Sequence, residues 1–152
     1  MMNANPPHRS YPASVLQCRC PRCREGKLFK NPVSIGLKRN MEMNPHCPVC
    51  GQPTDIEVGF YYGTGYVSYV LALLISGISF VAWWLAIGFS FQDNRFLYWV
   101  IANAVLLIVL QPWLMRLSRS LWISWFVRYD PNWKNHKPDD TERVVEGQMG
   151  NW

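Results

Sequence analysis

The chain has 152 residues, of which 49% are hydrophobic and 16% charged, and this length fits one domain or one small domain with a membrane anchor. The net charge of +5 is uneven, because residues 1–57 carry eight Lys or Arg against four Asp or Glu, whereas residues 58–92 carry no charge. No basic and aromatic repeat accompanies the positive charge, so nucleic-acid binding is not expected.

The N-terminal segment, residues 1–17, lacks the apolar core and the small-residue cleavage site of a secretory signal. We expect it to be a disordered leader. The first membrane helix would then direct insertion and stay in the mature protein.

Two pairs of cysteines follow the pattern Cys-Pro-x-Cys. In the second, "CPVCG", the proline stiffens the turn, and Gly51 permits the left-handed backbone that points amide hydrogens at a thiolate. The first pair matches it in "CPRC". Cys18 lies outside this repeated pattern and is left as a spare thiol. The predicted metal ligands are Cys20, Cys23, Cys47 and Cys50.

The 23 residues between the two pairs suit a zinc ribbon, in which two turns at the tips of short hairpins hold one metal ion tetrahedrally. We predict this β-structured ribbon over residues 18–58, with strands at 27–31, 39–44 and 54–62. Four thiolates leave no open coordination position, which favours structural Zn²⁺. An iron site of the rubredoxin type uses the same ligands and remains possible.

Other uses of the cysteines fit less well. Disulfides are disfavoured in a reducing cytoplasm. Copper delivery through one Cys-x-x-Cys pair would not require the second pair. His46 precedes Cys47 and could replace a ligand, but a neighbouring position without a ligand role is commoner.

Two uncharged segments predict a transmembrane hairpin over residues 59–116. Residues 66–89 would form a helix about 36 Å long, and residues 96–115 are also long enough to cross the hydrocarbon core of about 30 Å. A stripe of small residues favours close helix packing on the first segment: Ser68, Ala72 and Ser76. Asn103 could hydrogen-bond across to that helix.

Orientation follows from the basic residues near the ends of the two segments. Eight precede the first segment, and Arg116, Arg119 and Arg128 follow the second, whereas the connecting loop holds Arg95 alone. The positive-inside rule therefore predicts a multi-pass protein of the bacterial inner membrane with both termini in the cytoplasm.

The last third of the chain divides in two. Leu117, Leu121 and Trp125 recur at helical spacing, so residues 117–130 predict a short amphipathic helix at the membrane interface, ended by Asp130-Pro131. Residues 131–152 have little apolar content and predict a disordered tail. The expected fold is thus a small zinc-ribbon β head, two transmembrane helices and an interfacial helix.

Four stretches combine in chain order: "CPRCREGKLF", "HCPVCG", "GFYYGTGYVSY" and "LSRSLWISWFVRYDP". In this combination the chain resembles the DUF983 family of small bacterial membrane proteins, whose function is unknown. The resemblance covers roughly residues 18–131, and one departure is Arg24-Glu25 before Gly26, where some members have glycine directly after the cysteine. The gene neighbourhoods of some members imply a role near the assembly of haem-copper cytochrome oxidases.

No catalytic group is predicted, because His8, His46 and His136 are not placed with a nucleophile and a carboxylate. We therefore expect a non-enzymatic accessory or assembly factor of a membrane complex, with a respiratory complex as the candidate, whose zinc ribbon docks a partner in the cytoplasm. Its partners would be the lipid bilayer and another membrane protein, with no small-molecule substrate. The alternative is metal or redox handling, in which Cys18 would help to sense or deliver the metal.

Overall fold

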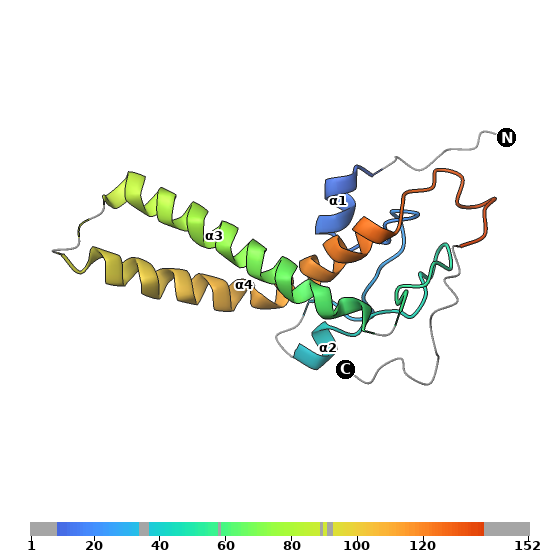
Figure 1. The fold of residues 1–152 in the computed structure, drawn as a ribbon, viewed down its shortest axis with the longest axis horizontal. Coiled ribbons are helices and arrows are strands. Elements are labelled where there is room, and N and C mark those ends of the chain that lie inside the picture. The colour runs from blue at the N-terminus through green and yellow to red at the C-terminus, as the bar shows by residue number, and fades with distance from the viewer. Residues whose placement is uncertain (1–8, 34–36, 58, 89, 91–92, 139–152) are drawn as a thin grey trace.

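A computed structural model describes residues 9–33, 37–57, 59–88, 90 and 93–138 (Figure 1). Its elements in chain order are α1 (Tyr11–Leu16), α2 (Leu37–Asn40), the 3-10 helix η1 (Phe60–Gly63), α3 (Thr64–Ile87) and α4 (Arg95–Phe126). Figure 1 shows α3 and α4 side by side as a hairpin, with the other elements gathered around one end of it. We call this end, formed by the described parts of residues 9–63 and 114–138, the head.

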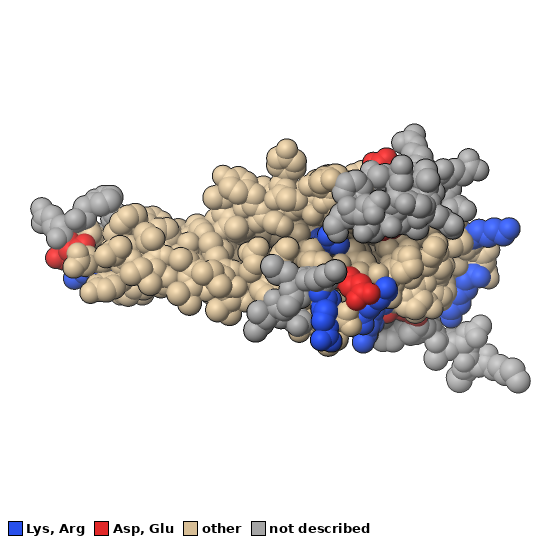
Figure 2. Space-filling view, turned by 90° about the horizontal axis from the view of Figure 1, so that it is seen from below, with Lys and Arg blue, Asp and Glu red and all other residues tan. Residues whose placement is uncertain are grey.

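The two long helices are apolar enough to cross a membrane. The segments Phe60–Ile87 and Arg95–Phe126 contain windows with mean hydropathies of 2.3 and 1.8, and these windows are almost entirely on the surface. Figure 2 shows charged side chains at the head and at the opposite tip, with an uncharged hairpin between them. These features fit a membrane protein.

Burial changes abruptly along both helices. On α3 the side chains of Thr64 and Val67 are buried, and on α4 the run of buried side chains begins at Leu114. The stretches outside the head, residues 68–87 and 95–113, are each about 30 Å long at 1.5 Å per residue. That length equals the hydrocarbon thickness of a bilayer, so the head fits on the membrane surface.

A small polar cluster joins the two helices. Asn103 of α4 donates from Nδ2 to the Ser76 hydroxyl at 3.1 Å, and its Oδ1 accepts from the Ser79 hydroxyl at 3.0 Å. The indole of Trp99 also donates to the Ser79 oxygen at 3.3 Å. The prediction that Asn103 hydrogen-bonds across the hairpin is confirmed.

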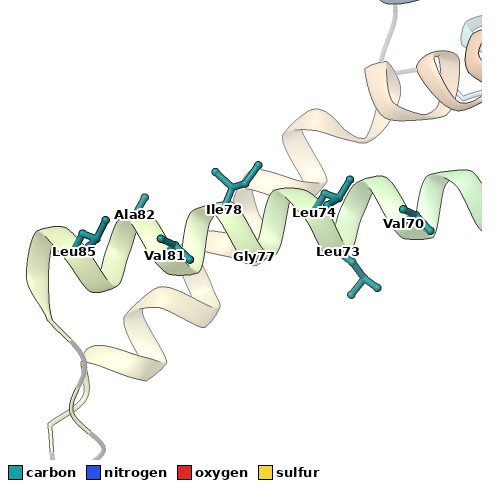
Figure 3. A pocket seen from close by; sticks show the side chains of 8 residues that line it. All are labelled: Val70, Leu73, Leu74, Gly77, Ile78, Val81, Ala82 and Leu85. Carbon is teal, nitrogen blue, oxygen red and sulfur yellow. The ribbon is translucent and has the colours of Figure 1, made fainter.

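The other side of α3 faces outward and is apolar (Figure 3). A shallow groove of about 730 Å³ follows it, lined by Val70, Leu73, Leu74, Gly77, Ile78, Val81, Ala82 and Leu85. Such a surface is stable against lipid chains and costly in water.

The structure corrects the prediction of a separate interfacial helix at residues 117–130. Helix α4 continues without a break through Pro112 and ends at Phe126. Although Trp125 and Phe126 are exposed, one side of α4 beyond Leu114 faces the head, as the burial of Ser118, Ser120 and Ile123 shows. These residues give α4 a second set of packing partners.

Part of the predicted disordered leader, residues 1–17, is helical. Helix α1 packs against α4, because the Ser120 hydroxyl donates to the carbonyl of Val15 at 3.0 Å and the hydroxyls of Tyr11 and Ser124 lie 2.8 Å apart. Pro12 occupies the first turn of α1, where a missing amide hydrogen has no cost. The leader's first eight residues lie outside the described residues.

The head contains no named β-strand among its described residues, so the predicted β ribbon is not confirmed. Antiparallel pairing is present as isolated bridges between Arg19 and Lys27, Phe29 and Met43, and His46 and Pro53. The predicted strands at 27–31 and 39–44 lie together in part, joined by backbone hydrogen bonds of 3.1 Å and 2.8 Å. The start of the second one is wrong, because Arg39 and Asn40 belong to helix α2. The third predicted strand, 54–62, is wrong in its last part, where η1 begins at Phe60.

The segment after α4 is also ordered by contacts. Residues 127–138, which we call the strap, run back over the first cysteine pair, where the Asp130 amide donates to the carbonyl of Arg22 at 3.2 Å. The prediction of a disordered tail is therefore corrected for residues 131–138. Residues 139–152 lie outside the described residues.

Candidate metal centre

The structure brings the four predicted ligands together. The sulfur atoms of Cys20, Cys23, Cys47 and Cys50 all lie within 4.8 Å of one another. Cys20 and Cys50 are 3.7 Å apart at sulfur, as are Cys23 and Cys47. Three of the side chains are buried and that of Cys50 is half-buried. All five cysteines of the chain are free of disulfides, and these four could hold a metal ion.

The two Cys-Pro-x-Cys turns, which we call the knuckles, have the same backbone geometry. The amide of Arg24 donates to the carbonyl of Cys20 at 2.8 Å, and the amide of Gly51 donates to that of Cys47 at 2.9 Å. Both residues after the second cysteine are left-handed, with φ of +59° for Arg24 and +71° for Gly51. The missing glycine of the first knuckle therefore leaves its geometry unchanged, although an arginine is strained there.

The contacts of Arg24 offset this strain. Its Nη1 donates to the carbonyl of Arg9 at 2.9 Å, and its guanidinium lies 3.9 Å from the centre of the Tyr129 ring. A cation over an aromatic ring contributes about 0.5–1 kcal/mol at a partly exposed site. This is of the same order as the cost of placing a residue with a Cβ in the left-handed region.

Position 26 requires glycine because another atom lies very close to it, and not because its backbone adopts a conformation that favours glycine. A Cβ at this position would overlap the sulfur of Cys47. Its amide points at the Cys23 sulfur at 3.4 Å, and its carbonyl accepts from the amide of Cys20 at 2.8 Å. The glycine that follows the first knuckle therefore contacts the second knuckle's ligand.

Contact among the sulfurs sets their protonation. The hydrogen bond with Cys23 raises the pKa of the Cys20 thiol far above its ordinary value, and the hydrogen bond with Cys20 lowers the pKa of the Cys47 thiol far below it. Several bare thiolates at this separation would repel one another. A divalent cation that displaces the remaining protons would relieve this repulsion.

The core around the cysteines includes the end of the second long helix. Ile123 is 0% exposed and Val127 9% exposed, and both belong to the same cluster of buried side chains as Cys20, Cys23 and Cys47. Periodicity in the sequence identified this part of α4 as amphipathic but gave no sign that its apolar side faces the cysteines. Only the tertiary structure shows it.

Arg116 fastens the head to α4. Its side chain is 5% exposed and donates to the carbonyls of Asn40 and Asn31, each at 2.8 Å, and of Pro32 at 3.0 Å. The guanidinium also lies 4.6 Å from the centre of the Phe29 ring. A buried charge with several hydrogen bonds is stabilising where an unpaired one would be costly.

Arg119 makes a second connection one turn further along α4. It donates to the carbonyl of Met41 at 3.2 Å, and its guanidinium lies 4.9 Å from the centre of the Tyr61 ring. Burial raises the pKa of the nearby Asp55 carboxyl, and the positive charge of Arg119 partly offsets this rise. Arg116 and Arg119, which the sequence suggested as charges near the membrane interface, therefore connect α4 to the head.

Cys18 lies outside the group of four cysteines. Burial raises the pKa of its thiol to about 11, although the charge of Arg116 and a hydrogen bond with Ser120 lower it. Cys18 is therefore a neutral thiol at physiological pH. His46 is exposed and outside the group, His136 pairs with Asp130, and His8 lies outside the described residues.

Comparison with known proteins gives one match. No curated protein and no solved structure matches the chain. A family model described as "Protein of unknown function (DUF983)" matches residues 37–126, which hold Cys47, Cys50, both long helices and Arg116. The match begins after the first knuckle. Because it covers more than half of the 152 residues, the chain belongs to the DUF983 family, as the sequence resemblance predicted.

Proposed function

We propose that the four cysteines hold one structural Zn²⁺. A tetrahedral zinc with Zn–S bonds of about 2.3 Å places its sulfur ligands about 3.8 Å apart. The 3.7 Å separations of Cys20 from Cys50 and of Cys23 from Cys47 agree with this value. The same geometry accommodates iron, and elemental analysis of the purified protein distinguishes the two.

The ligand set supports a structural and not a catalytic role. Four thiolates complete the coordination of zinc, so that no position is left for water or substrate. The head has little apolar core of its own, and metal binding would supply much of its folding free energy. On this basis we propose that the protein is not an enzyme.

We further propose that the protein is an accessory or assembly factor of a larger membrane complex, such as a respiratory complex, with the head as its docking module. The observation that carries this proposal is the packing of Ile123 of α4, and of Val127 directly after it, into the cysteine core. A zinc centre built onto the end of a spanning helix presents one rigid surface at a fixed height above the membrane. Such a surface suits a partner that is itself fixed in the bilayer.

The same proposal places the protein in the bacterial inner membrane with the head in the cytoplasm. Basic residues are concentrated in the head, and the loop between the helices holds Arg95 paired with Asp93 at 3.6 Å. Free cysteines in the centre are compatible with a reducing compartment. Labelling of single cysteines placed at Asp93 and at Lys27 from either side of the membrane tests this orientation.

Metal delivery was the alternative suggested by the fifth cysteine. A buried, protonated Cys18 outside the ligand group is a poor acceptor for a metal ion, because the thiolate is the ligand form. We therefore give this alternative second place. Replacement of Cys18 by serine should leave the zinc content unchanged.

The accessory role is tested in native membranes. The tagged full-length chain and its Cys47→Ser variant are purified in mild detergent, and the respiratory complexes of a deletion strain are quantified. We expect the wild-type chain to retain a membrane-protein partner that Cys47→Ser loses, and the deletion strain to assemble less of that partner's complex. A lone monomer together with normal complexes in the deletion strain would contradict the proposal.

A further inference from the structure

The strap crosses the first knuckle and is fastened to a single arginine. Arg22, the third residue of "CPRC", is 5% exposed. Its Nη2 donates to the carbonyls of His136 and Lys137, each at 2.8 Å, and lies 3.5 Å from Oδ2 of Asp130. Hydrogen bonds from a charged donor contribute about 1.5–3 kcal/mol, more than neutral ones.

Asp130 organises the strap from within. One carboxylate oxygen accepts from the amide of Asn132 at 2.9 Å, and the other lies 3.0 Å from Nδ1 of His136. The same oxygen contacts Arg22, so one carboxylate links the start of the strap, its end and the knuckle.

The strap also contacts the rest of the centre. Trp133 packs against the buried cluster that contains three of the ligands, and the ring of Tyr129 lies under the guanidinium of Arg24. At its far end, Pro138 is the side chain nearest to Gly51 of the second knuckle. Residues 127–138 therefore extend from one knuckle to the other.

The described part of the strap has few backbone hydrogen bonds. Its internal backbone hydrogen bonds each close a single turn. The amide of Trp133 donates to the carbonyl of Asp130 at 3.3 Å, and the amide of Asn135 donates to the carbonyl of Asn132 at 2.8 Å. The side chains of Asn132, Lys134, Asn135, His136 and Lys137 are exposed. A segment with exposed side chains and few backbone bonds opens locally at a small fraction of the global unfolding free energy.

We propose that the strap is a closure over the metal centre, and that its attachment to Arg22 sets the rate at which the metal ion leaves. This rests on the proposed zinc centre. Zinc passes to another ligand when that ligand reaches the metal beside a departing thiolate. The closed strap blocks this approach at the first knuckle, and the open strap permits it. The strap should therefore change the exchange rate much more than the zinc content.

Two substitutions in the full-length chain remove the attachment. Arg22→Val turns the first knuckle into "CPVC", the sequence of the second knuckle, so the turn itself remains compatible with the fold. Asp130→Ala removes the carboxylate that organises the strap. The matched controls are Arg39→Val, at an exposed arginine of α2, and Asp93→Ala, in the loop at the other end of the hairpin.

The experiment measures zinc content first and zinc transfer second, on protein in detergent. Transfer is followed by the absorbance of a chromogenic chelator in excess. We expect one zinc per chain throughout, release about tenfold or more faster from Arg22→Val and Asp130→Ala, and no change for the controls. Absence of zinc from the wild-type chain would contradict the proposed centre. Normal zinc content with wild-type release rates in both variants would overturn the strap proposal alone.

A second measurement needs no variant. Brief trypsin treatment of the zinc-loaded wild-type chain cuts the strap after Lys134, whose side chain is exposed, and mass spectrometry identifies the site. We expect the cut chain to retain its zinc and to release it faster. If the chain cut after Lys134 releases zinc at the rate of the intact chain, the strap does not control exchange, even where the substituted chains fail to fold.

Discussion

The head and the hairpin are stabilised in opposite ways, although α4 belongs to both. Between residues 95 and 113 this helix shows mainly apolar side chains on its surface, and its described hydrogen bonds to α3 centre on Asn103. From Leu114 onward one side of the helix is buried, and Arg116, Ser118 and Ser120 are among the buried side chains. Helix α4 thus exposes apolar side chains in its first part and buries several polar side chains in its last part.

This difference follows from the two solvents. In lipid, apolar side chains on the surface have no cost, and association depends on close packing and a few hydrogen bonds. In water the head must bury its apolar groups, but it is too small to bury many. Charged hydrogen bonds and a cysteine cluster that could hold a metal ion add to this small core. Changes in the head should therefore be more destabilising than changes in the hairpin.

Metal removal should produce the largest effect. Structural zinc contributes about 10–16 kcal/mol to the folding of small zinc-dependent domains, so a strong chelator or Cys47→Ser should unfold the head. The hairpin should stay helical in detergent. Far-UV circular dichroism reports the helices, and trypsin cleavage at Lys27 reports the head. Cys18→Ser is the control and should keep its zinc, whereas resistance of Cys47→Ser to trypsin would contradict the prediction.

Arg116→Met should have the next largest effect. It leaves the carbonyls of Asn31, Pro32 and Asn40 without their donor, which should lower the free energy of unfolding by about 3 kcal/mol or more. Urea unfolding of the head, followed by tryptophan fluorescence in detergent, measures this loss. The control is Arg128→Met, at an exposed arginine after α4. Equal stability of the two variants would rule out Arg116 as the connection between helix and head.

Gly26→Ala should weaken the metal centre specifically. The new methyl group overlaps the Cys47 sulfur, and overpacking of this kind costs about 1–3 kcal/mol. Competition with a chelator of known affinity should show zinc binding weakened by about tenfold or more. The matched change Gly65→Ala, where a Cβ meets no atom within 4 Å, should leave zinc binding unchanged. Equal affinities for the two variants would contradict the close approach at Gly26.

Asn103→Leu should have the smallest effect. Hydrogen bonds between membrane helices contribute about 0.6 kcal/mol on average, and the leucine that replaces this one is well tolerated in lipid. Unfolding of the hairpin by titration with a denaturing detergent measures the change. Ala104→Leu, on the exposed side of α4, is the control. A loss for Asn103→Leu comparable with that for Arg116→Met would remove the distinction between head and hairpin.

Patterns of local origin were readable from the sequence. The two apolar segments and the paired Cys-Pro-x-Cys turns depend on residues close together in the chain, and the structure contains both helices and the four-cysteine group. The bond from Asn103 was also foreseeable, since an amide in a spanning helix needs a partner. The helix predicted at residues 66–89 is displaced by no more than a few residues from α3, which begins at Thr64 and ends at Ile87.

Features that depend on distant contacts were not readable. Arg116 and Arg119 follow an apolar segment, as interface charges do, and nothing in their spacing tells that they bind carbonyls of residues 31–41. The uncharged run that ends before Arg116 suggested that the membrane helix ends near residue 115, but α4 continues because the head supplies it with partners. The polar composition of the strap conceals its attachment to Arg22 in the same way.

The arrangement of the cysteine core has a consequence for the order of events during synthesis. All four cysteines precede both long helices in the chain, but Ile123 of the same core lies near the end of α4, and Val127 directly follows α4. The core therefore stays incomplete during synthesis until the second long helix has been made. A chain that stopped before Ile123 could not close this core. A completed head thus requires that both long helices have been synthesised.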